Sequence, residues 1–151
     1  MANSRTGSTP SFGYSVVENL NTTKQLRRKD SGKLFTLDNT SAFTINLPKL
    51  SSKIAGWHCK FIVTVDVSAD VSLMAYGLAA AGGTTDDAET VVFREFPMAD
   101  EAGAVTTGQD GVTIAAATII GDTIDVITDG TSWFITAMVH EIAHTDDIDA
   151  D

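Results

Sequence analysis

The stretch DTIDVITDGTSWFITAMV, residues 122–139, decides the fold of this chain. Two runs rich in β-branched and aromatic residues flank the pair Asp129-Gly130. Both central residues of a two-residue type I′ turn need positive φ, and Asp-Gly tolerates that conformation. The stretch therefore predicts a β-hairpin with a two-residue turn, and it indicates an all-β protein.

Alternating segments upstream extend this pattern. In residues 42–47, apolar side chains occupy every second position, which is typical of a half-buried strand. Residues 57–67 predict the longest strand, and no long stretch has the 3.6-residue period of a helix. Short strands with turn residues between them indicate a single β-sandwich or barrel-like domain. The face of the longest strand that we expect to be buried carries Cys59, Phe61, Val63, Val65 and Val67.

Length and composition bound the class of protein. A chain of 151 residues with 43% hydrophobic residues predicts one globular domain with a sizeable core. There is no apolar run near the ~18 residues of a membrane span and no secretory signal, so we expect a protein made in a cytoplasm with no membrane partner. The lone Cys59 stands in an apolar run, and we expect it to be buried. We expect Trp57 and Trp133, which also have apolar neighbours, to pack in the core or at an interface.

Charge is unevenly distributed along the chain. Residues 1–60 carry nine Lys and Arg against three acidic residues, whereas residues 61–151 carry Arg94 alone against seventeen, for a net charge of −10. This asymmetry predicts a basic arm and an acidic body. The body should repel nucleic acid, whereas the arm could meet an acidic partner or the acidic body of a neighbouring copy.

The charge pattern and the β signals divide the chain into three segments. We predict an extended basic N-terminal arm over residues 1–33, a β-sandwich or barrel domain over residues 34–144, and an acidic flexible tail over residues 145–151. Removal of the arm is expected to leave the β domain folded. The arm residues expected to contact a partner are Val16, Val17, Leu20, Arg27, Arg28 and Lys29.

One motif resembles a catalytic site. His140-Glu141-Ile142-Ala143-His144 fits the pattern in which two histidines on a helix bind one zinc ion and the glutamate acts as general base. If the preceding strand continues, however, the two histidines lie about 13 Å apart and cannot share an ion. Because a third ligand is also missing, we expect no catalytic, cofactor or metal site, and a zinc peptidase remains a remote alternative.

Three local signatures occur in order over roughly residues 34–139: FTINLP at residues 43–48, GWHCKFIV at residues 56–63 and GDTIDVITDGTSW at residues 121–133. In their order and spacing they resemble the small β-rich decoration, or cement, proteins of tailed-bacteriophage capsids and the related head-fibre proteins.

The resemblance implies a non-enzymatic virion structural protein with a jelly-roll or β-tulip type of fold. It implies a homo-oligomer, most simply a trimer, seated on the outer surface of the capsid, with the major capsid protein as its partner. It implies no cofactor. The alternative is a fibre or tail module that binds a receptor or a glycan, for which residues 77–88 form the candidate loop.

Overall fold

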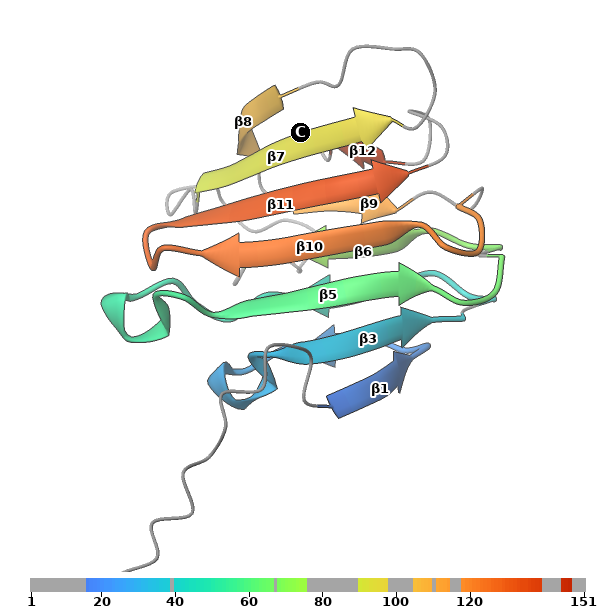
Figure 1. Ribbon diagram of the computed structural model, residues 1–151, viewed down its shortest axis with the longest axis horizontal. Helices are drawn as coiled ribbons and strands as arrows, with labels where there is room; N and C mark the ends of the chain where they lie inside the picture. The colour runs from blue at the N-terminus through green and yellow to red at the C-terminus, as the bar shows by residue number, and fades with distance from the viewer. Residues whose placement is uncertain are drawn as a thin grey trace, which may run out of the picture.

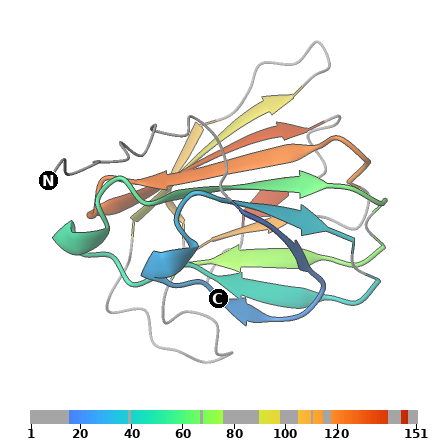
Figure 2. The same cartoon turned by 60° about the horizontal axis from the view of Figure 1, so that its bottom comes forward.

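Two mixed β-sheets face each other around one hydrophobic core (Figures 1 and 2). The computed structural model describes residues 16–38, 40–66, 68–75, 90–97, 105–109, 111–114, 118–139 and 145–147. Over these residues the chain is built from strands and two short 3-10 turns, and neither sheet closes on itself. The all-β fold class is therefore confirmed, whereas the jelly-roll or β-tulip type stays a prediction.

The larger sheet has seven strands and the smaller sheet has five. In spatial order, the larger sheet contains β1 (Val16–Leu20), β3 (Lys33–Leu37), β5 (His58–Val63), β10 (Thr123–Thr128), β11 (Ser132–Val139), β7 (Thr90–Pro97) and β8 (Val105–Gln109). The smaller sheet contains β12 (Thr145–Asp147), β9 (Gly111–Ile114), β6 (Val71–Met74), β4 (Phe43–Asn46) and β2 (Lys24–Gln25). The 3-10 turns are η1 (Arg28–Asp30) and η2 (Ser52–Ile54).

The first six strands alternate between the two sheets. β1, β3 and β5 pair in parallel in the larger sheet, and β2, β4 and β6 pair in parallel in the smaller one. Parallel neighbours cannot be joined by a tight turn, and here a strand of the opposite sheet completes each crossover. As a consequence, η1 and η2 lie at the end of the domain where β3 and β5 begin, and the connections that follow β3 and β5 lie at the opposite end (Figure 1).

The core consists of the inward faces of both sheets. The alternation predicted for residues 42–47 is confirmed, since Phe43, Ile45 and Leu47 are buried. The strand predicted over residues 57–67 is shorter than expected. It ends at Val63, and the Val65 side chain is 52% exposed.

Aromatic contacts link the inward-facing strands. Trp57 and Trp133 pack edge to face with ring centroids 5.3 Å apart, and both are buried, so their predicted place in the core is confirmed. Phe35 and Phe61 stack at the same centroid separation. Such pairs add about 0.5–1.5 kcal/mol beyond the burial of their area. These contacts therefore tie β3, β5 and β11 to a common interior.

The hairpin of β10 and β11 is confirmed, but its predicted turn is wrong. The strands pair antiparallel, and the last pair is Thr128 with Trp133. Gly130 has φ of 95°, whereas Asp129 is not among the residues with positive φ, so the turn is not type I′. Instead, Asp129 Oδ1 accepts hydrogen bonds of 2.8 Å from the backbone N–H groups of Thr131 and Ser132. The aspartate side chain therefore closes the loop, and Gly130 supplies the left-handed position.

Residues 16–33, assigned from the sequence to the arm, are part of the domain. β1 pairs with β3, β2 pairs with β4, and the side chains of Leu20 and Leu26 are buried. The boundary at residue 33 is thus corrected, because this segment supplies strands and apolar core side chains. Residues 1–15 lie outside the described residues. In the predicted acidic tail, residues 145–147 form β12, which pairs with β9.

The buried position of Cys59 gives a first testable prediction. Its side chain is 1% exposed, and burial raises the pKa of the thiol well above its usual value. Because the thiolate is the reactive form, a thiol reagent should not label the native protein at neutral pH. Labelling should instead follow the denaturant unfolding curve measured by tryptophan fluorescence. Rapid labelling without denaturant would contradict the buried position.

Candidate partner-binding surface

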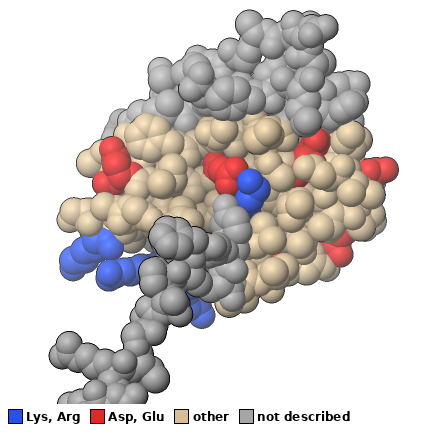
Figure 3. Space-filling model, in the orientation of Figure 1, with Lys and Arg blue, Asp and Glu red and all other residues tan. Residues whose placement is uncertain are grey.

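The predicted contact residues separate into an exposed group and one core residue. Val16 and Val17 are 49% and 64% exposed on β1, and Arg27, Arg28 and Lys29 are exposed at η1. Leu20 is 4% exposed, because its pairing with Leu37 places it on the inward face. Leu20 is therefore corrected to a core residue. Figure 3 shows basic side chains gathered at the end of the sheet where η1 and η2 lie.

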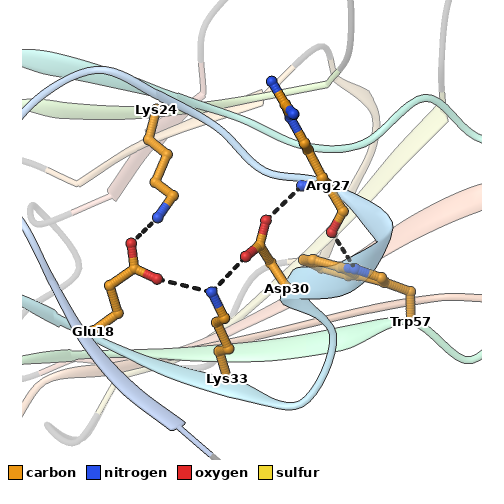
Figure 4. A network of polar contacts seen from close by, with 6 residues as sticks. All are labelled: Glu18, Lys24, Arg27, Asp30, Lys33 and Trp57. Carbon is orange, nitrogen blue, oxygen red and sulfur yellow. Dashed lines mark hydrogen bonds and ion pairs between the residues drawn. The ribbon is translucent and has the colours of Figure 1, made fainter.

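Arg27, Arg28 and Lys29 at η1 form a basic turn, which two hydrogen bonds to the backbone of Arg27 hold in place. Asp30 Oδ2 accepts a hydrogen bond of 2.9 Å from the backbone N–H of Arg27, at the start of η1. The indole Nε1–H of Trp57 donates to the carbonyl oxygen of Arg27 at 3.1 Å (Figure 4). The buried side chains of Trp57 and Asp30 thus hold the turn against the core, and its basic residues are exposed to solvent.

A charge network joins the turn to the first three strands. Lys33 Nζ lies 2.5 Å from Asp30 Oδ1 and 2.9 Å from Glu18 Oε2, and Glu18 also forms an ion pair with Lys24 (Figure 4). Burial would raise the pKa of Asp30, but the hydrogen bonds from Lys33 and from the N–H of Arg27 outweigh it and hold that pKa below its usual value. The Asp30 carboxyl is therefore a charged, buried anchor.

β1 is one of the two edge strands of the larger sheet, and β8 is the other. An edge strand presents backbone N–H and C=O groups to which another chain can add a strand. Val17 aligns with Leu34 of β3, and Val16 aligns with Lys33. The exposed valines therefore lie on an edge that the charge network connects to the basic turn. An apolar edge beside fixed positive charge is suited to binding a protein surface that is itself apolar and acidic.

The sequence analysis missed a second exposed surface. On the outward face of the larger sheet, Ile127, Phe134 and Met138 are between 38% and 50% exposed. Among the side chains described on β5, β10 and β11, Lys60 and Asp125 form an ion pair of 2.9 Å at the centre of this face (Figure 3). The signal was present in residues 122–139, where the outward positions 127, 134 and 138 hold large apolar residues among polar ones.

Two other candidate sites lie outside the described residues. These are the His140–His144 motif and the loop at residues 77–88. In the described part of the chain, no group of three or more His, Cys, Asp or Glu side chains is arranged to hold a metal ion. The same residues contain no helix with the length and apolarity that a membrane crossing requires.

Comparisons with known proteins return no relatives. No family model matches the chain, and neither the curated proteins nor the solved structures give a match.

Proposed function

We propose that this chain is a decoration protein, a non-enzymatic structural protein that binds the outer surface of an assembled tailed-bacteriophage capsid and stabilises it. The observation that carries the proposal is the edge strand β1, whose residues Val16 and Val17 are exposed and which the charge network connects to the basic residues of η1. The three signatures over residues 43–133 support the same class. The partners are the major capsid protein and adjacent copies of the chain.

The physical basis is a small contact repeated many times. Full burial of a valine side chain contributes about 1.5–3 kcal/mol, so Val16 and Val17 alone give weak binding. Several joined copies bind together with an effective concentration that raises the overall affinity without any new contact. A pre-ordered edge also avoids part of the entropy that a mobile arm loses on binding. An oligomer can therefore clamp neighbouring capsid subunits although each subunit binds weakly.

The structure changes the best test of this proposal. Deletion of residues 1–33 would remove β1, β2 and η1, and with them the core residues Leu20 and Leu26. Loss of binding after this deletion would then report a damaged fold. Substitutions of exposed residues on β1 are the sharper variants.

The double substitution V16D/V17D is expected to weaken capsid binding at least about 100-fold, because two apolar contacts are lost and charge enters the interface. The measurement is co-sedimentation with capsids of the encoding phage that lack the protein. The matched control is Ile127→Asp, which places one charge on an equally exposed position of the outward sheet face. Unchanged binding by V16D/V17D, with loss of binding by Ile127→Asp, would show that the capsid contacts the outward face instead.

A further inference from the structure

The two ends of the domain carry opposite charge. η1, η2 and the segment between β4 and η2 lie at one end, and Trp57 joins the first two of these through its hydrogen bonds. The connections after β3 and β5 and the one before β10 meet at the other end, where Thr64 N–H donates to Leu37 O at 3.1 Å. Figure 3 shows most of the visible Lys and Arg at the lower left, with an acidic group above them, and further Asp and Glu towards the right. The basic end carries the exposed residues Arg27, Arg28, Lys29, Lys49 and Lys53. It also carries one exposed acid, Asp129, because the turn between β10 and β11 lies beside Ser51 and Ser52, so its net charge is positive.

The opposite end is both acidic and apolar. Asp66 and Asp70 are exposed there, and the described residues of its three connections (38, 40–42, 64–66, 68–70 and 118–122) include no Lys or Arg. The same connections carry Val65 and Ile120, with side chains 52% and 64% exposed. Exposed apolar side chains next to charged ones are a composition found in protein-binding surfaces. We call this surface the acidic end.

The backbone of the acidic end is held by hydrogen bonds. Gly121 N–H donates to Val63 O at 2.9 Å, and Ile119 N–H donates to Asp122 Oδ2 at 3.2 Å. Ile120 N–H donates to Asp66 Oδ1 at 3.3 Å, which joins the connection before β10 to the one after β5. A backbone that is already ordered loses little conformational freedom on binding, which favours binding of a partner.

The basic end of a second copy has the matching chemistry. Its positive charges face outward, and the methylene stems of Arg28, Lys29 and Lys53 can cover the exposed side chains of Val65 and Ile120. From this complementarity we infer that copies of the chain associate head to tail, with the basic end of one copy bound to the acidic end of the next. A contact between two different surfaces builds a ring when its rotation closes and an open filament when it does not.

This inference deepens the proposed function, on which it rests for its place on a capsid, by naming the adjacent copy as the partner of the basic turn. The exposed valines of β1 remain for the capsid. Because the contact is dominated by exposed charges, it is screened by salt. Association of the wild-type chain should therefore be about tenfold weaker or more in 0.5 M NaCl than at low salt, as measured by light scattering of the full chain.

Charge reversal at each end provides the decisive experiment. The variant R28E/K29E/K53E has two acidic ends, and D66K/D70K has two basic ends. Each alone should be monomeric at concentrations where the wild type associates. Mixed together they should associate, because each then meets an opposite charge. The control K60E/D125K reverses the ion pair on the outward face and should associate like the wild type. Circular dichroism and thermal melting verify that each variant is folded.

The outcomes separate this inference from the proposed function. A monomeric wild type at low salt, or folded reversal variants that stay monomeric when mixed, would overturn head-to-tail association. If the monomeric protein still sedimented with capsids, the decoration role would stand without head-to-tail association. Conversely, salt-sensitive association restored by mixing, together with no capsid binding, would support the contact and refute the decoration role.

Discussion

Replacement of Trp133 by alanine is expected to lower the free energy of unfolding by about 3–5 kcal/mol. Trp133 is fully buried, packs against Trp57, and pairs with Thr128 at the closed end of the hairpin. Its removal leaves a cavity between the two sheets, and the surrounding strands are held by their ladders and cannot collapse to fill it. Urea unfolding followed by circular dichroism measures the change.

The variant Trp133→Phe is the matched control. The indole Nε1 of Trp133 is buried, and no residue in the described part of the chain accepts a hydrogen bond from it. Phenylalanine keeps most of the ring and removes this unpaired donor, so we expect a loss of about 1 kcal/mol. If Trp133→Ala and Trp133→Phe lost equal free energies of unfolding, the packed volume of the Trp133 side chain would not be the source of its stabilising effect.

Replacement of Asp30 by alanine is expected to lower the free energy of unfolding by about 2–4 kcal/mol. Asp30 is 2% exposed, holds the N–H of Arg27, and forms the ion pair with Lys33. The substitution leaves both partners without this carboxylate, and Lys33 retains its contact with Glu18. The basic turn should loosen at the same time, which is measurable as faster amide hydrogen exchange at residues 27–30.

The contribution of Asp30 should depend on pH in a defined direction. Its pKa is held below the usual value in the folded protein, so the unfolded chain takes up a proton first as the pH falls. Its stabilising effect is therefore complete above the unfolded pKa of about 3.9 and disappears as the pH falls through the folded pKa. The stability difference between the wild type and Asp30→Asn should shrink over that range. A difference that persists at lower pH would indicate that the charge of Asp30 has no role.

Local patterns predicted the parts of the fold that depend on local contacts. The alternation of Phe43, Ile45 and Leu47 identified β4 and its buried face, and the runs around Asp129-Gly130 identified β10 and β11. The parallel arrangement of β1, β3 and β5 was not predictable in this way, because each partner follows a strand of the other sheet. Residues 16–33 were accordingly assigned to an arm, since polar residues hide the spacing of Leu20 and Leu26.

The candidate surface was predictable in composition but not in arrangement. Arg27, Arg28 and Lys29 form a visible basic run in the sequence, and the structure places them on the surface, while their contact with a partner stays a prediction. The buried anchor Asp30 and the acidic end were missed, because both arise from connections that the topology brings together. Val65 and Ile120 read as strand or loop residues in the sequence. The fold brings together the connection after β5, which holds Val65, and the connection before β10, which holds Ile120. The hydrogen bond from Ile120 N–H to Asp66 Oδ1 joins these two connections.

The most direct test of the decoration role is the temperature at which capsids release their DNA. Particles of the encoding phage from which this gene has been deleted should release DNA at a lower temperature than wild-type particles. Addition of the purified protein should restore the wild-type temperature, and addition of V16D/V17D should not. Deleted particles that bind no protein, or that bind it with no change in the release temperature, would contradict a role in stabilising the capsid.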